Sequence, residues 1–260
     1  MSDIEDTVIL REQSLHAYSS IVLGQRKDQQ DSLNIMKKDD HTTLCIIADG
    51  MGGLQGGQLA SSLAVNTFCG HFMDDPIDHV SSFLYNQAIE CDHLIADLED
   101  SKGNPLQAGS TLVAAYVHDD ELNFVSVGDS RLYLFRNNEL VQVTKDHNYF
   151  MILKEAKDNM SEEIYNEELK KGESLVSYLG MDGLKYIEIS KEPIKLQPQD
   201  YFLMCSDGLY KRLNHEQLTA VMMDVPFVGI ERTVKTLQDE AAMAKGRKQD
   251  NTSVIVAGYY

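Results

Sequence analysis

Hydrophobic residues follow two kinds of pattern along the chain, and the order of these patterns predicts the architecture. Short segments rich in Ile, Val, Leu and Thr are typical of β-strands, and they lie at residues 16–23, 32–36, 43–48, 111–117, 122–127, 131–135, 140–143, 186–189, 201–205 and 253–257. Longer segments with apolar residues at helical spacing lie at residues 55–73, 77–98, 213–223 and 228–244. Strands followed by helix pairs favour an α+β fold of antiparallel strands covered by helices over a βαβ alternation.

Residues 145–185, here called the flap, interrupt this order. They are polar, rich in Lys and Glu, and weakly patterned, so we interpret them as an inserted segment and expect them to be the most mobile part of the chain. No internal repeat or linker is visible elsewhere. Residues 1–260 are therefore predicted to form a single domain that carries the flap.

The charge balance excludes several classes of partner. Acidic residues number 41 and basic residues 23, which gives a formal net charge of −18. So negative a chain repels nucleic acid and anionic membrane surfaces, and its short basic cluster at Lys245, Arg247 and Lys248 has no aromatic residue to stack on a base. Neither nucleic acid nor a membrane is expected as a partner.

Cysteine usage and the N-terminus indicate where the protein works. The four cysteines show no paired spacing, and Cys45 and Cys205 lie in apolar runs where a free thiol behaves as a small buried hydrophobe. The N-terminus is acidic and lacks the basic and apolar regions of a signal peptide. A reduced, cytoplasmic protein is expected, and a monomer.

Aspartates at the ends of predicted strands are the strongest chemical signal. They are Asp31, Asp49, Asp129, Asp207 and Asp250. Carboxylates that converge repel one another unless a cation lies among them, and an all-oxygen ligand set favours Mg²⁺ or Mn²⁺ over zinc. Each aspartate alone is also a common turn or cap residue, and the pattern leaves this alternative open.

The glycine-rich segment DGMGGLQGG, at residues 49–57, follows a predicted strand and precedes a predicted helix. A dinucleotide-binding G-x-G-x-x-G motif fails because Gln55 stands where the third glycine is needed, and a P-loop fails for lack of GK[ST]. We interpret these glycines as allowing backbone carbonyls to approach a metal beside Asp49.

Motifs in a fixed order point to a family. The segments are RKDQQDS at 26–32, ADGMGGLQGGQLAS at 48–61, AGSTLVAA at 108–115, VGDSRLYLF at 127–135, TKDHN at 144–148, CSDGLY at 205–210 and QDNTSVIV at 249–256. In these segments the chain resembles the metal-dependent serine/threonine protein phosphatases of the PPM type (protein phosphatase 2C), in their compact bacterial form. The resemblance extends from about Tyr18 to Tyr259.

The resemblance implies a four-layer αββα sandwich, in which helix pairs flank two packed antiparallel sheets. It also implies hydrolysis of phosphoserine and phosphothreonine on proteins by a water that two Mn²⁺ or Mg²⁺ ions activate, in opposition to a cognate serine/threonine kinase. Arg26 matches the arginine that grips the substrate phosphate. Two divalent ions balance four carboxylates, and Arg26 then makes the site cationic inside an acidic protein.

The implied metal ligands are Asp31, Asp49, Gly50 through its carbonyl, Asp129, Asp207 and Asp250. Asp49 is expected to bridge the two ions and to act in catalysis with the phosphate-binding arginine. Asp207 and Asp250 are expected on the first ion and Asp31 on the second, partly through water. Asp129 matches a residue that helps to hold a third, weaker ion.

The chain also departs from the family pattern. Met51 stands where some relatives carry a histidine proposed as general acid, so the proton donor is unassigned, and a structural role is favoured for the nearby His147. Gln30 replaces a frequent glutamate. Lys211 replaces a usual aspartate, which leaves the third ion open and gives Asp129 the alternative role of turn former.

Other functions share this sequence pattern. A catalytically impaired relative that acts as a phosphoprotein-binding regulatory module would keep the fold, although such relatives usually lose metal carboxylates. A phosphatase for small phosphoesters, or for the anti-anti-sigma partners of bacterial switches, would use the same chemistry. Compact members sometimes accompany type VI secretion systems, but no residue here establishes that setting.

Overall fold

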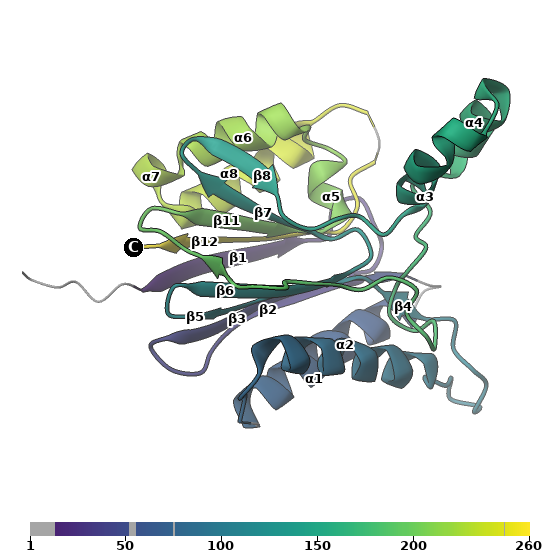
Figure 1. Cartoon of the computed structure of the whole chain (residues 1–260), viewed down its shortest axis with the longest axis horizontal. Helices are drawn as coiled ribbons and strands as arrows, with labels where there is room; N and C mark the ends of the chain where they lie inside the picture. Colours follow the sequence, from purple (N-terminus) through teal and green to yellow (C-terminus); the bar gives the residue numbers. More distant parts are fainter. Residues whose placement is uncertain (1–13, 52–55, 75, 247) are drawn as a thin grey trace, which may run out of the picture.

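Two antiparallel β-sheets lie face to face at the centre of the molecule, with helices on both outer faces (Figure 1). The structure is a computed structural model that describes residues 14–51, 56–74, 76–246 and 248–260. The five-stranded sheet has the order β1 (Leu15–Val22), β12 (Thr252–Tyr259), β11 (Tyr201–Cys205), β7 (Arg131–Arg136) and β8 (Glu139–Gln142). Its first and last strands in the sequence, β1 and β12, are neighbours, so the two ends of the described chain meet in one sheet.

The second sheet has seven strands. Its main order is β10 (Ile194–Lys195), β6 (Glu121–Val127), β5 (Leu112–His118), β3 (Thr42–Met51) and β2 (Asp31–Lys37), with β4 (Gly109–Ser110) beside β3 and β9 (Glu188–Ile189) beside β6. Helices α1 (Gly56–Asp74) and α2 (Val80–Ala96) cover its outer face. Helices α5 (Asp207–Tyr210), α6 (His215–Met223), α7 (Val225–Val228) and α8 (Ile230–Met243) cover the five-stranded sheet (Figure 1).

Strict alternation of side chains divides the interior into three apolar layers. In β3, Leu44 and Ile46 pack against α1 and α2, whereas Cys45 and Ile47 pack between the two sheets. A third layer lies between the five-stranded sheet and α5, α6 and α8. Because both faces of the central strands are buried, their sequences are continuously apolar rather than alternating. This arrangement confirms the predicted α+β sandwich of helix pairs on two sheets.

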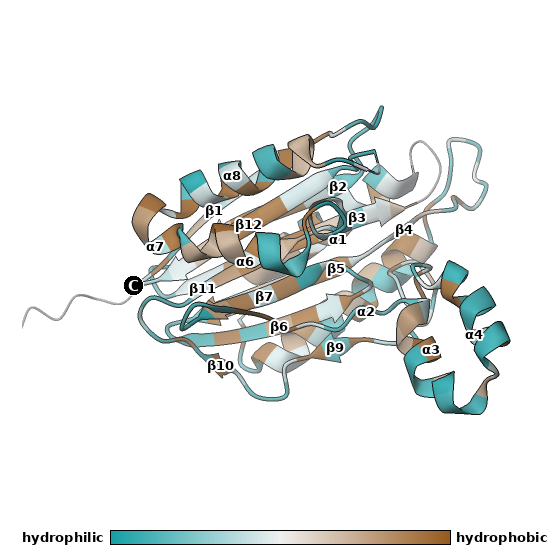
Figure 2. Cartoon of the chain, turned by 90° about the horizontal axis from the view of Figure 1, so that it is seen from above, coloured by the Kyte–Doolittle hydropathy of each residue, from teal (hydrophilic) through white to brown (hydrophobic). Residues whose placement is uncertain are grey.

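The flap includes elements that the sequence analysis did not identify. It contains two helices, α3 (Tyr149–Ala156) and α4 (Glu162–Glu168), which project away from the sandwich (Figure 1). On α3 only Leu153 is buried, and α4 buries no residue and is hydrophilic on the face seen in Figure 2. The helices escaped the sequence analysis because they lack the apolar stripe on which recognition of a helix depends.

Some smaller elements were also missed. Strand β10 and helices α5 and α7 are two to four residues long, too short for a hydrophobic period to develop. Gly52, Gly53 and Gln55 of the glycine-rich segment, and Arg247 of the basic cluster, lie outside the described residues. Their predicted roles therefore remain predictions.

The cysteine prediction is confirmed, since all four thiols are free and buried. Burial raises the pKa of the Cys45 thiol and of the Cys205 thiol to about 12, which leaves both in their neutral form at neutral pH. Among the helices of the described residues, none has both the length and the apolar character needed to span a bilayer.

The layer between the sheets can be tested with one large-to-small substitution. Phe202 on β11 is 1% exposed and packs between the sheets. We expect Phe202→Ala to lower the free energy of unfolding by about 3–5 kcal/mol, because it leaves a cavity in a close-packed layer. Urea denaturation measures this quantity. Phe227 on α7, which is 86% exposed, provides the control, and Phe227→Ala should cost about 0.5 kcal/mol or less. Equal losses in the two variants would contradict the layer assignment.

Candidate active site at the end of the two sheets

A pocket of about 370 Å³ opens where residues from both sheets meet. Its lining includes most of the predicted site residues, namely Arg26, Asp49, Gly50, Asp129, Asp207 and Asp250. These residues come from positions up to about two hundred apart in the sequence, and strand pairing brings them to the same end of the sandwich. The remaining predicted ligand, Asp31, is buried beside the pocket.

Asp31 and Asp49 are direct partners across the β2–β3 ladder. Like charges in such positions destabilise a sheet unless something neutralises them. The hydroxyls of Ser206 and Ser253 each donate a hydrogen bond of 2.8 Å to Oδ2 of Asp31, so both sheets contact this one carboxylate. Its Oδ1 is buried and has no hydrogen-bond partner among the described residues.

Burial raises the pKa of Asp31 to about 6, although the two serine hydroxyls oppose that shift. Burial also raises the pKa of Asp49 well above its ordinary value, and the negative charges of Asp31 and Asp207 add to the effect. The raised pKa of Asp31 and that of Asp49 lead to the same conclusion. Negative charge at this position is unfavourable without a cation, so the donor set fits a hard divalent ion in its buried part.

Cationic side chains engage the other two carboxylates of the core set. Arg26 donates from Nη2 to Oδ2 of Asp250, and Lys211 donates from Nζ to Oδ2 of Asp207 at 2.6 Å. As placed, the described residues contain no group of three or more His, Cys, Asp or Glu side chains that could hold a metal ion. The structure thus brings the predicted ligands together, with two of them paired to protein cations.

Asp129 lies at the inner wall of the pocket. It accepts a hydrogen bond of 2.9 Å from the hydroxyl of Tyr210, and Nζ of Lys211 lies 3.8 Å from its Oδ2. Burial raises the pKa of Asp129 to about 6, and the charge of Asp207 adds to the shift while that of Lys211 opposes it. On Lys211, burial alone would lower the pKa, but Asp207 and Asp129 outweigh burial and raise it. Lys211 therefore remains a cation in the acidic cluster.

The family profile described as protein phosphatase 2C matches residues 23–245 of the chain. The chain belongs to this family. The match confirms the resemblance drawn from the motifs, and with it the assignment to a class of serine/threonine phosphatases.

Relatives and solved structures agree with this membership. The serine/threonine phosphatase stp of Listeria welshimeri is 28% identical over 201 residues, which cover 76% of this chain and 78% of the relative. The structure of the Streptococcus agalactiae serine/threonine phosphatase superposes with a TM-score of 0.81 at 22% identity, covering 94% of this chain and 99% of that one. The catalytic domain of the phosphatase PstP, solved in complex with two manganese ions, gives a TM-score of 0.75 at 24% identity and covers 95% of this chain and 99% of its own. These structural likenesses confirm the αββα fold.

Within this protein phosphatase 2C fold, Asn251 positions the loop that carries Arg26. Its side-chain oxygen accepts from the backbone N–H of Gln30 at 2.9 Å, and its side-chain nitrogen donates to the carbonyl of Leu23 at 2.9 Å. One amide therefore fastens both ends of the loop. The sequence analysis quoted Asn251 within a motif but gave it no role, and the same is true of Ser206 and Ser253. One feature of the sequence could have pointed to these three residues. Each is a polar residue close to a motif aspartate at the end of an apolar strand.

Gly50 shows what one glycine of the glycine-rich segment does. A Cβ atom on Gly50 would lie 2.0 Å from the carbonyl oxygen of Gly57, at the start of α1. Only glycine permits this approach between β3 and the helix that follows it. The tight junction holds Asp49 against the pocket, while the predicted role of the Gly50 carbonyl as a ligand remains a prediction.

His147 contacts the backbone rather than the pocket, which agrees with the structural role favoured for it. It is buried, its Nδ1 accepts from the backbone N–H of Gly128 at 3.2 Å, and it is not among the described residues that line the pocket. Burial lowers its pKa to about 4, so the ring is neutral at neutral pH. Met51 and Gln30 do line the pocket. Neither has an acidic proton, so the general acid remains unassigned.

The raised pKa of Asp31 predicts how stability depends on pH in metal-free protein. The folded state holds the Asp31 proton more tightly than the unfolded chain, so this group stabilises the fold fully below about pH 4, and the contribution is lost as the pH rises through about 6. Two pKa units correspond to about 3 kcal/mol. Asp31→Asn keeps an acceptor for the serine hydroxyls but does not titrate. With EDTA present, we expect the wild type to lose about 2–3 kcal/mol more than Asp31→Asn between pH 4 and 7.

Urea denaturation across this pH range provides the measurement. Asp239→Asn, at an exposed position on α8, is the control and should follow the wild type. If Asp31→Asn lost stability as steeply as the wild type, the burial of an ionised Asp31 would not be the cause of that loss.

Proposed function

We propose that this protein hydrolyses phosphoserine and phosphothreonine in proteins with the help of two divalent cations, and so opposes a serine/threonine kinase. The observation that carries the proposal is the gathering of Asp31, Asp49, Asp207 and Asp250 at one end of the sandwich in a member of the protein phosphatase 2C family. The Oδ1 of Asp31, which finds no hydrogen-bond donor in the described part of the chain, supports it, because such a buried carboxylate oxygen is suited to a cation.

The same four aspartates would hold the ions, and the Gly50 carbonyl would contribute a further oxygen. When bound, the two ions lower the pKa of a water and stabilise the charge of the phosphate during in-line displacement. Oxygen ligands suit Mg²⁺ and Mn²⁺ alike, and the manganese-bound PstP structure supports manganese as a first choice. For Asp207 and Asp250 to act as ligands, Lys211 and Arg26 have to release them.

Arg26 has the position of a phosphate-binding residue. Its side chain is 59% exposed at the pocket and reaches Asp250 inside it. A guanidinium can donate two parallel hydrogen bonds to two phosphate oxygens. We infer that Arg26 exchanges its carboxylate partner for the substrate phosphate, while Asn251 keeps its loop in place. No cysteine is available as a nucleophile for this phosphate, since all four are buried.

The position of Lys211 affects how many metal ions the site can hold. Its Nζ lies 2.6 Å from Asp207, 3.8 Å from Asp129 and 3.9 Å from Oε2 of Glu173 in the flap. The ammonium of Lys211 among these carboxylates supplies the positive charge that a further ion would bring. We therefore infer two bound ions rather than three, with Asp129 held by Tyr210 and Lys211 instead of by a metal.

The central test is turnover by variants of the ligands. Hydrolysis of p-nitrophenyl phosphate and of a phosphothreonine peptide is measured with and without Mn²⁺, for the wild type, Asp207→Asn and Asp250→Asn. We expect metal-dependent turnover that falls about 100-fold or more in either variant, because several kcal/mol of transition-state stabilisation depend on the ions. Asp239→Asn, which removes a distant exposed carboxylate, should keep wild-type rates.

Wild-type rates in Asp207→Asn or Asp250→Asn would reject the assignment of these two ligands. If the wild type itself showed no turnover with Mn²⁺ while still binding phosphopeptide, the alternative of a phosphoprotein-binding regulatory module would take precedence. Lys211 and the flap would then be the features that separate this chain from its active relatives.

Thermal unfolding tests ion binding without reference to turnover. A ligand that binds only the folded state adds about 2.7 kcal/mol at a hundredfold excess over its Kd. For a chain of this size that corresponds to a rise in Tm of about 5–10 °C. We expect Mn²⁺ to produce this rise in the wild type and in Asp239→Asn. The doubly substituted Asp207→Asn/Asp250→Asn protein should show little of it, and a full rise there would place the ions elsewhere.

A further inference from the structure

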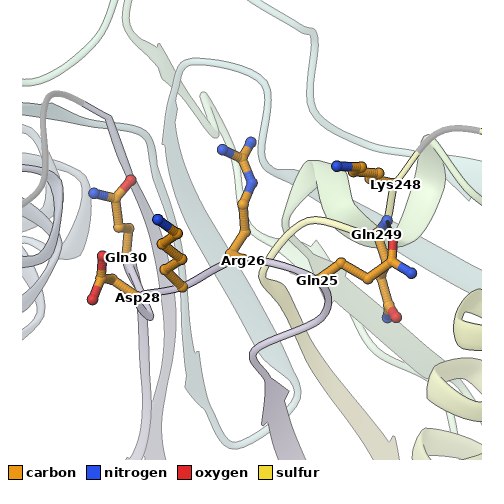
Figure 3. Close-up of a pocket in the computed structure, with 7 residues that line it drawn as sticks. Gln25, Arg26, Asp28, Gln30, Lys248 and Gln249 are labelled. Atoms are coloured by element: carbon orange, nitrogen blue, oxygen red, sulfur yellow. Dashed lines mark hydrogen bonds between the residues drawn. The ribbon is translucent and has the colours of Figure 1, made fainter.

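A second pocket, of about 610 Å³, adjoins the candidate active site and shares Arg26 and Gln30 with it. Its other lining residues are Gln25, Lys27, Asp28, Lys248 and Gln249. In Figure 3 the side chain of Lys248 extends toward the guanidinium of Arg26, and Asp28 points away from it. We call this pocket the lysine groove. A substrate whose phosphate reached Arg26 would have its neighbouring residues within reach of the groove.

The groove carries positive charge that the protein itself does not use. Lys27 and Lys248 are exposed and form no ion pair or hydrogen bond with any described residue, and Asp28 is not paired with either of them. Lys211, which lines the candidate active site, behaves differently, since it contacts three carboxylates. In a chain of net charge −18, two unpaired lysines beside the phosphate-binding arginine form a local field of opposite sign.

Backbone contacts join the loops that carry the two lysines. The N–H of Gln25 donates to the carbonyl of Gln249 at 2.9 Å, and the N–H of Gln249 donates to the side-chain oxygen of Gln25 at 3.3 Å. Gly24 has a φ of +62°, and a Cβ there would lie 2.3 Å from the carbonyl oxygen of Asp250. The loop of Lys27 and the loop of Lys248 therefore meet at a junction that only glycine allows. The backbone of each lysine is therefore held beside the other loop by the fold.

We propose that the lysine groove binds acidic side chains that flank the phosphorylated residue, so that the protein selects phosphoprotein segments rich in Asp and Glu. This inference rests on the proposed function and names its substrate class. The remainder of so acidic a surface repels such segments, which makes the groove the favourable place for them. Ion pairs at this exposed position are screened, so the selection depends on ionic strength.

The test compares two phosphothreonine peptides that differ only in flanking residues, Asp and Glu in one and Ser and Gln in the other. At low salt with Mn²⁺ present, we expect the wild type to prefer the acidic peptide about two- to tenfold in kcat/KM, chiefly through KM, and to lose this preference at 0.5 M NaCl. The doubly substituted Lys27→Gln/Lys248→Gln protein should show no preference. Lys27→Arg/Lys248→Arg should retain it, because the charges are kept.

Lys235→Gln, at an exposed position on α8, is the matched control and should retain the wild-type preference. Equal kcat/KM of the wild type for the two peptides, or an unchanged preference in Lys27→Gln/Lys248→Gln, would overturn the inference. Failure of the proposed function is seen separately, as absence of hydrolysis of either peptide by the wild type. In that case the ratio of the two Kd values, measured by fluorescence anisotropy with fluorescein-labelled peptides, decides whether the groove selects acidic segments.

Discussion

Repulsion among carboxylates at one end of the two sheets is the constraint on which the site depends. The β2–β3 register places Asp31 directly opposite Asp49, and a shift of one residue would turn one of them to the other face of the sheet. The register is fixed by the buried residues of β3 and by partly buried apolar residues of β2 such as Leu33 and Ile35, so apolar packing forces negative charges together. The hydroxyls of Ser206 and Ser253, which reach Asp31 from the other sheet, lessen that cost without removing it.

The layered core explains why such a site can persist. Asp49 is carried by β3, a central strand buried on both faces, so it cannot move away from Asp31 without opening two apolar layers at once. The negative charge of Asp207 and Asp250 is therefore neutralised by groups that can move, the long side chains of Lys211 and Arg26. A rigid set of anions beside adjustable cations is an arrangement in which divalent ions or a phosphate can replace protein partners at small structural cost.

The sequence predicted those parts of the molecule whose pattern is local. Apolar runs identified the long strands and α1, α2, α6 and α8, and motif order identified the family, which the profile match confirms. It missed α4, which buries nothing, and it gave no role to Asn251, whose two hydrogen bonds join residues more than two hundred positions away. Contacts of this kind depend on tertiary proximity, and no periodicity or composition reports them. The individual ligand roles of the aspartates also remain predictions, because geometry shows proximity but not coordination.

Lys211, one of the residues that depart from the family pattern, is physically connected to the flap. It stands where an aspartate is usual, and Glu173 of the flap lies 3.9 Å from its Nζ. An aspartate at position 211 would repel Glu173 and add to the negative charge around Asp129 and Asp207, whereas a lysine attracts all three. Lysine at position 211 thus replaces repulsion among carboxylates with ion pairs that connect Glu173 of the flap to Asp207 in the pocket. A lysine ammonium at this place also differs from a bound metal ion, because its charge is present at every metal concentration.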